Sequence, residues 1–170
     1  MLKYSVRLRC TSVRYFNVAT KSSPRADYHW IYVPEEKYPF YRVGIYTNAV
    51  PAMAPPGRGS LYVELSERGP RPTGAALDDL VRRTAEGLVA AGALASTDEI
   101  LFADLMEIEY AYVVFDDHYY QATDTIRAWL EAHDVFPRGR YGSWTYNSME
   151  DCLIAGREVA ETINRRLAAP

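Results

Sequence analysis

Hydrophobic and polar positions alternate along the first third of the chain, in short stretches rich in β-forming residues. The alternation is loose over 4–16 and recurs over 28–33, 40–46 and 60–66. Prolines and glycines separate these stretches, most densely at 48–59, where no regular element is expected. The pattern therefore predicts four strands in this part of the chain.

The spacing of hydrophobic residues becomes helical after the proline- and glycine-rich segment 69–74. It then predicts helices over 77–94, over 119–130 and from Asp151 toward the C-terminus. Ser148 and Asp151 have capping-box spacing at the start of the last helix. The buried stripe of that helix is expected to comprise Cys152, Ala155, Gly156, Val159, Ile163 and Leu167.

One long strand is predicted between the helices, over 102–115, and a short one over 135–136. Glu107 and Glu109 place the first half of the long strand against water, whereas its second half is apolar on both faces. Several strands are thus followed by helices, a strand, a helix, a short strand and a final helix. This order predicts an α+β fold with a mixed, largely antiparallel sheet covered by helices.

The composition narrows the classes of function. A formal net charge of −3 with scattered basic residues argues against nucleic-acid binding, and no apolar run approaches the ~18 residues of a membrane helix. Cys10 and Cys152 lack metal-binding or redox spacing, which fits a reducing cytoplasm. Dinucleotide, P-loop, zinc-protease and nucleophile-elbow motifs are absent, and no metal site is expected.

Candidate binding residues concentrate in the run RGRYGSWTYNSMED at 138–151. Its arginines, its aromatic rings and the free N–H groups of a helix start suit an anionic, planar or phosphorylated ligand. The 14 tyrosines of the chain line either a wet cleft or an aromatic sheet face, and both interpretations stay open. Asp117, ahead of the helix at 119–130, is interpreted as an N-cap rather than a catalytic acid.

Other polar residues near predicted strand ends have a structural alternative to a binding role. Arg42 alternatively pairs with Glu64 across the sheet, and Tyr112 alternatively belongs to the core. Arg140 alternatively holds the turn at Asp134. The candidates for which a binding role is considered are Arg42, Tyr112, Arg140 and Tyr146.

Two stretches resemble the flavin-dependent UDP-galactopyranose mutases, especially the eukaryotic-type branch, and their amine oxidase-like relatives. The first is WIYVPEEKYPFYRVGIYTN at 30–48, and the second is GRYGSWTY at 139–146, ahead of the closing helix. Three shorter matches lie between these two stretches and occur in the same order as in the family: SLYVELSE at 60–67, STDEI at 96–100 and AYVVFD at 111–116. The resemblance covers most of the chain from about residue 28 onward.

The resemblance implies a division of the chain and a set of binding residues. Residues 1–137 would form a substrate-binding sheet-and-helix domain, and residues 138–170 a flavin-closing loop and C-terminal helix. Arg42, Tyr112 and Tyr146 would contact the diphosphate of a nucleotide-sugar. The implied FAD-binding positions are Arg140, Gly142, Ser148, Met149 and Glu150.

The function implied is that of the C-terminal part of an FAD-dependent UDP-galactopyranose mutase-like enzyme. The alternatives are part of an amine or protoporphyrinogen oxidase-like FAD oxidoreductase, and a stand-alone, non-catalytic binding module. The sequence departs from the family in lacking the nucleotide-binding glycine loop and in having Val113 where a proline is expected. We therefore expect the FAD-binding domain to lie outside this chain, and the chain alone to be inactive without retained FAD. The family also allows a homo-oligomer.

Overall fold

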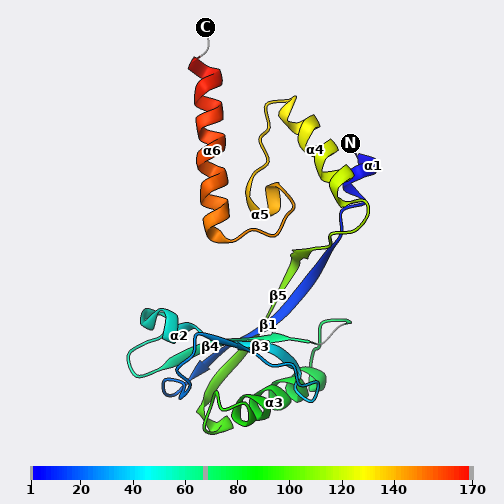
Figure 1. Cartoon of the computed structure of the whole chain (residues 1–170). Helices are drawn as coiled ribbons and strands as arrows, with labels where there is room; N and C mark the ends of the chain where they lie inside the picture. Colours follow the sequence, from blue (N-terminus) through cyan, green and yellow to red (C-terminus); the bar gives the residue numbers. More distant parts are fainter. Residues whose placement is uncertain (1, 67–68, 169–170) are drawn as a thin grey trace. The chain divides into compact units, whose positions relative to one another are not determined.

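The computed structural model describes residues 2–66 and 69–168 of the chain. It confirms the predicted α+β class, with one five-stranded sheet. The elements in chain order (Figure 1) are α1 Leu2–Ser5, β1 Cys10–Thr20, β2 Trp30–Tyr32, β3 Phe40–Ile45, α2 Tyr46–Ala49, the 3-10 turn η1 Pro51–Met53, β4 Gly59–Leu65, α3 Ala75–Ala90, the 3-10 turn η2 Thr97–Glu99, β5 Ile100–Val113, α4 Tyr119–Glu131, α5 Gly139–Gly142 and α6 Met149–Ala168.

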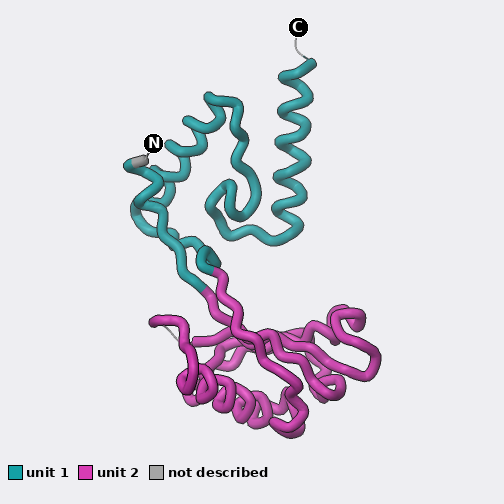
Figure 2. Tube along the Cα trace, turned by 180° about the vertical axis from the view of Figure 1, so that it is seen from behind, with its two compact units in different colours: residues 1–12, 109–170 teal, residues 13–108 magenta. Residues whose placement is uncertain are grey.

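The chain folds into two compact units, which are coloured separately in Figure 2. The sheet unit consists of Val13–Ile108, and the helical unit combines Met1–Ser12 with Glu109–Pro170. The boundary between the units falls inside β1 and inside β5. The division predicted between residues 137 and 138 separates substrate-binding from flavin-contacting residues rather than compact units, and it stays a prediction.

The sheet has the strand order β2-β3-β4-β1-β5. β2 pairs with β3, β3 with β4, and β4 with β1, all antiparallel. The N–H of Val114, just beyond β5, donates to the carbonyl of Arg9, just before β1. The N–H of Lys21, just beyond β1, donates to the carbonyl of Glu99, just before β5. β1 and β5 therefore also run antiparallel, so every strand pairing in the sheet is antiparallel.

The core of the sheet unit lies between one face of the sheet and α3 (Figure 1). Side chains alternate between the two faces of a strand, so the strands contribute alternate residues to this core. In β3 a register shift between Phe40 and Arg42 interrupts the alternation, so that Phe40 is buried together with Val43 and Ile45. Removing such side chains from water provides about 1.5–3 kcal/mol for each large apolar residue. The largest fully buried hydrophobic side chains of the strands and of α3 are Phe16, Phe40, Val43, Ile45, Leu61, Val63, Leu80 and Leu88.

Helix α3 ends at Ala90 rather than at residue 94 because the chain turns through a left-handed glycine. Gly92 has φ +75°, a conformation that glycine adopts without a steric penalty. The N–H of Ala93 then donates back to the carbonyl of Leu88, which satisfies a carbonyl in the last turn. Elsewhere in this unit, Arg71 donates a hydrogen bond of 2.5 Å to the carbonyl of Leu105 in the edge strand β5.

One strand prediction was wrong in its bounds, and another was wrong altogether. The strand expected over 4–16 is formed as Cys10–Thr20, and a short helix, Leu2–Ser5, precedes it. The strand extends to Thr20 because Val18 and Thr20 continue the burial alternation against the core, which outweighs the polar character of this stretch. The strand expected over 135–136 is not formed, and the chain there is irregular.

The N-cap expected at Asp117 was also wrong. Helix α4 begins after His118, whose side chain makes no capping hydrogen bond. Asp116 accepts instead from the N–H of His118 at 3.0 Å, which closes an Asx-type turn one residue earlier.

The capping box at the start of α6 is confirmed, whereas its predicted buried stripe is not. Ser148 Oγ accepts from the N–H of Asp151, and the Asp151 carboxylate accepts from the N–H of Ser148. No described residue of α6 is buried, and Leu167 is 80% exposed. Helical spacing identifies the apolar face of a helix but does not provide a neighbour to cover it. Cys152, Ala155 and Val159 are half-buried, whereas Gly156, Ile163 and Leu167 are exposed.

We predict that Gly87→Ala destabilises the sheet unit, although alanine favours helices. A Cβ at position 87 would lie 2.7 Å from the ring of Phe40, which is only 1% exposed. Overpacking of this kind costs about 1–3 kcal/mol, more than the gain of up to about 1 kcal/mol from helix propensity. Urea unfolding should show a lower midpoint. Gly156→Ala in α6 is the matched control, because nothing lies within 4 Å of its new Cβ; equal midpoints for the two variants would contradict the prediction.

We also predict that the first turn of α6 loses order in acid. Hydrogen bonds from the backbone and the hydroxyl of Ser148 lower the pKa of Asp151 below its usual range. The ionised carboxylate stabilises the helix fully at pH values above the pKa of Asp151 in the unfolded chain, about 3.9. This stabilisation is lost as the pH falls through the lower pKa of Asp151 in the folded chain. The ¹³Cα shifts of residues 149–152 should report this loss. Asp151→Asn should abolish the pH dependence and Glu150→Gln should preserve it; a transition that survives Asp151→Asn would refute this assignment.

Candidate functional site

The sheet face opposite α3 carries polar and aromatic side chains in rows that cross the strands. The strand registers place Tyr32, Arg42 and Glu64 side by side in one row. In the next row, Gly44 of β3 lies opposite Tyr62 of β4. These positions alternate with the core residues of the same strands, so they face away from α3. The sheet face therefore presents an arginine among tyrosines.

Arg42 and Glu64 form an ion pair at the centre of this face. Tyr41 donates a hydrogen bond of 2.6 Å to the same carboxylate, so Glu64, a residue that is only 7% exposed, is hydrogen-bonded as buried polar groups normally are. Burial opposes the charge of Arg42, but hydrogen bonds with Tyr32 and Glu64 outweigh it and raise the pKa of the guanidinium. The structural alternative considered for Arg42, pairing with Glu64, is thus observed.

Arg42 nevertheless keeps hydrogen-bonding capacity beyond Glu64. Its Nη1 lies 3.4 Å from the Tyr32 hydroxyl, and its Nε is buried without a partner in the described structure. The rings of Tyr32 and Tyr62 each lie 5.8 Å from the guanidinium. A Cβ at Gly44 would lie 2.0 Å from the Tyr62 ring, so only glycine allows this ring to lie across the strand. We call Arg42, Tyr32, Tyr62 and Glu64 the Arg42 group.

A second arginine–tyrosine cluster lies in the helical unit. The Arg140 guanidinium lies 5.1 Å from the Tyr112 ring and 5.0 Å from the Tyr146 ring, and these two rings stack at 5.9 Å. Arg140 also donates to the carbonyl of Ala111 at 2.7 Å and to that of Asn147 at 3.2 Å. We call Arg140, Tyr112 and Tyr146 the Arg140 group. The structure thus brings three predicted site residues into contact.

The alternatives considered for the residues of the Arg140 group are not observed. Asp134 is held by Arg166 at 2.8 Å rather than by Arg140. Tyr112 is half-buried against Tyr146 and outside the buried core.

A strained turn positions Tyr146 beside Tyr112. Trp144 has φ +49°, an outlier for a bulky side chain, and such strain concentrates at functional sites. The carbonyl of Trp144 accepts from the Tyr119 hydroxyl at 2.8 Å, which fixes the turn to α4. The indole N–H of Trp144 is buried without a partner in the described structure. No residue type in this segment indicated the conformation in advance.

The other residues expected near a flavin lie along the segment that joins α5 to α6. Gly142 ends α5, where a Cβ would lie 3.2 Å from the backbone of Pro137. Ser148 is engaged in the capping box, and Met149 is 87% exposed. Glu150 is exposed in the first turn of α6. The N–H groups of residues 149 and 150 belong to the first turn of the helix, where they have no intrahelical acceptor.

The described residues contain neither a candidate metal site nor a membrane-spanning helix. Across residues 2–66 and 69–168, no group of three or more His, Cys, Asp or Glu side chains is placed to hold a metal ion. Within the same residues, no helix is long and apolar enough to cross a membrane.

Comparison with known proteins supports the fold. No protein-family model matches the chain. The crystal structure of reduced UDP-galactopyranose mutase matches with a TM-score of 0.70 and 24% identity, over 85% of this chain and 31% of the mutase chain. The structure of an Exiguobacterium sp. 255-15 protein, named for protoporphyrinogen oxidase, matches with a TM-score of 0.64 and 11% identity, over 98% of this chain and 37% of the other.

This chain therefore spans about a third of the length of the two structures that it matches. At these identities the likeness concerns the fold. The resemblance predicted from the sequence is confirmed at that level: the chain shares its fold with part of a UDP-galactopyranose mutase and with part of the Exiguobacterium protein.

Proposed function

We propose that this chain is the substrate-binding and flavin-contacting part of an FAD-dependent enzyme similar to UDP-galactopyranose mutase. The observation that carries the proposal is the pair of arginine–tyrosine groups, centred on Arg42 and Arg140. Both arginines lie in the stretches that resemble the mutases, and the chain shares the mutase fold over 85% of its length. The substrate class is a nucleotide-sugar diphosphate.

The chemistry of both groups suits a diphosphate. Guanidinium groups bind phosphate oxygens through short, charge-assisted hydrogen bonds, and phenol hydroxyls add neutral donors. Arg42 would offer its remaining N–H groups together with the Tyr32 hydroxyl. In the helical unit, the hydroxyls of Tyr112 and Tyr146 extend from rings that the Arg140 guanidinium holds in place.

The residues around α5 and the start of α6 fit a contact with FAD. Arg140 supplies a positive charge, and the N–H groups of Met149 and Glu150 supply donors at the positive end of the α6 dipole. Gly142 and Ser148 leave little side-chain bulk in this segment. FAD, when bound, would supply the nucleophile for a ring contraction of the sugar without net redox change. The role of Arg140 and of the α6 start is to orient the flavin and to stabilise its negative charge.

A second candidate function is that of an amine or protoporphyrinogen oxidase-like enzyme, in which FAD accepts a hydride. The observation in its favour is the likeness to the Exiguobacterium protein over 98% of this chain. Affinity for UDP would support the mutase-like function. Affinity for an amine or a porphyrin in place of UDP would support the oxidase-like function.

We predict that the chain binds UDP and that Arg42→Lys weakens the binding about tenfold, because lysine retains the charge but loses the planar guanidinium fork. Lysine is preferable to alanine here, since alanine would leave the buried Glu64 carboxylate without its cation. Isothermal titration calorimetry would measure both affinities.

The matched control for the UDP measurement is Arg14→Lys. Arg14 is also ion-paired on a strand, to Glu107 at 3.2 Å, but by strand alternation it belongs to the same sheet face as the core residues Phe16 and Val18, opposite to that of Arg42. Its substitution should leave UDP affinity unchanged. Absence of UDP binding at millimolar ligand, or equal losses in the two variants, would refute the role of the Arg42 group.

We also predict that the purified chain shows no flavin absorption band, because its sequence contains no glycine-rich dinucleotide-binding loop. Added FAD should bind weakly and without saturation in a fluorescence titration. A yellow protein with stoichiometric FAD would contradict the expectation that the cofactor is held mainly by residues outside this sequence.

A further inference from the structure

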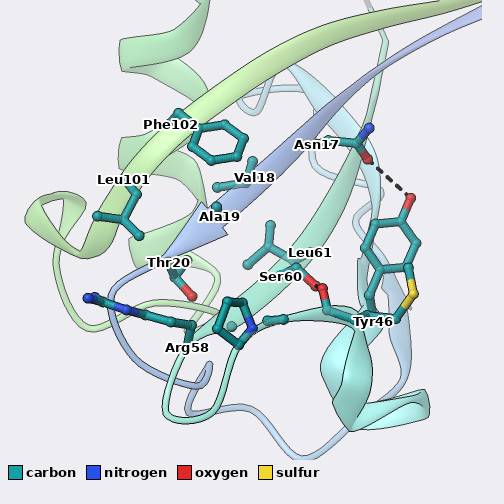
Figure 3. Close-up of a pocket in the computed structure, with 14 residues that line it drawn as sticks. Asn17, Val18, Ala19, Thr20, Tyr46, Arg58, Ser60, Leu61, Leu101 and Phe102 are labelled. Atoms are coloured by element: carbon teal, nitrogen blue, oxygen red, sulfur yellow. Dashed lines mark hydrogen bonds between the residues drawn. The ribbon is translucent and has the colours of Figure 1, made fainter.

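The sheet unit contains a cavity of about 580 Å³ at one end of the sheet (Figure 3). Its walls come from the end of β1, the starts of β4 and β5, and the irregular segment around Met53 and Pro55. A volume of this size is typical of sites for drug-sized ligands. The cavity lining does not include Arg42, but it adjoins the Arg42 group, because the ring of Tyr46 in the lining lies 5.0 Å from the ring of Tyr62.

The body of the cavity is apolar. The accessible apolar wall comes from Met53, Leu101 and Phe102, and the Phe102 ring can be seen in Figure 3. Val18 and Leu61 lie beneath this wall with almost no exposed surface. Phe102 is 59% exposed and Leu101 is 48% exposed, so both keep apolar surface available to a ligand. A lining of this kind favours a flat hydrophobic molecule, which removes ring and methyl surface from water together.

One end of the cavity carries neutral hydrogen-bonding groups. The Tyr46 hydroxyl donates to Asn17 Oδ1 at 3.2 Å (Figure 3), which leaves the Asn17 amide N–H groups as donors. Burial raises the pKa of Tyr46, so its phenol stays protonated at neutral pH. This end therefore suits an uncharged acceptor such as a carbonyl or an ether oxygen.

The residues that line the cavity carry positive charge only. Arg58 is the one charged residue among the side chains that line it, and no carboxylate lies among them. Arg58 Nη1 donates to the carbonyl of Lys21 at 3.1 Å, a neutral partner that leaves the positive charge uncompensated. An anionic group on the ligand would complement this charge.

From the apolar wall and the single uncompensated cation we propose that this cavity binds a planar aromatic carboxylate. The ring system lies against Phe102, Leu101 and Met53, and the carboxylate reaches Arg58. Exposed side chains at the rim leave the site open to a ligand from solution. The proposal involves neither FAD nor Arg42, and it assigns the cavity to a small molecule rather than to a second chain.

The test is a titration of the whole ¹⁵N-labelled chain with 2-naphthoate, followed by amide chemical shifts. 2-Naphthylmethanol, with the same ring system and no charge, is the matched ligand. We expect saturable shifts at cavity residues, with tighter binding of the carboxylate. Arg58→Gln should weaken naphthoate binding by about three- to tenfold, since an exposed guanidinium contributes less than a buried one, and should leave the alcohol unaffected. Arg157→Gln, an exposed arginine on α6, should change neither affinity.

A second variant tests the apolar wall. Ala19→Leu places a larger side chain in the cavity and should abolish binding of both ligands, while unchanged amide shifts elsewhere report an intact fold. Three results would overturn the proposal: no saturable shifts at the cavity, shifts centred on the exposed face of α6, or equal affinity for the carboxylate and the alcohol in the unsubstituted chain.

Discussion

The burial of one sheet face against α3 is the constraint on which the Arg42 group depends. Phe16, Val43 and Leu61 are fully buried in that core, and strand geometry then sends their neighbours to the opposite face. A slip of one residue in β3 would move Arg42 into the core and Val43 into water. The hydrophobic contacts therefore set the position of the charged side chain, and Glu64 stabilises it there.

The two arginines differ in how their charge is balanced. Arg42 is paired with the carboxylate of Glu64, so the group has little net charge, and an anion would have to compete with that carboxylate. Arg140 is held by the carbonyl oxygens of Ala111 and Asn147, which fix its position without neutralising it. Attraction of an anion at a distance should consequently arise mainly from Arg140, whereas Arg42 contributes directional hydrogen bonds.

The sequence allowed prediction of features that depend on local pattern. Residue spacing predicted the capping box at Ser148, and the pairing of Arg42 with Glu64 was considered as the structural alternative to a binding role. Contacts that depend on register or on a strained backbone were missed. Tyr62 contacts Arg42 because the strand pairing places the Tyr62 ring over Gly44. The positive φ of Trp144 is not indicated by the residue types around it. The fold class and the candidate residues of the Arg140 group were thus predictable, whereas Tyr32 and Tyr62 of the Arg42 group were not.

The edge strand β5 has a consequence for the behaviour of the protein in solution. An exposed edge offers unpaired backbone groups to the strands of other molecules, and natural proteins often protect such edges with charged side chains. Arg71 donates to the carbonyl of Leu105, and Arg140 donates to that of Ala111. Each guanidinium occupies a backbone acceptor and places a cation where an incoming strand would have to pair. Both arginines thereby oppose the pairing of β5 with a strand of another molecule, and at Arg140 this effect adds to the proposed role in ligand binding.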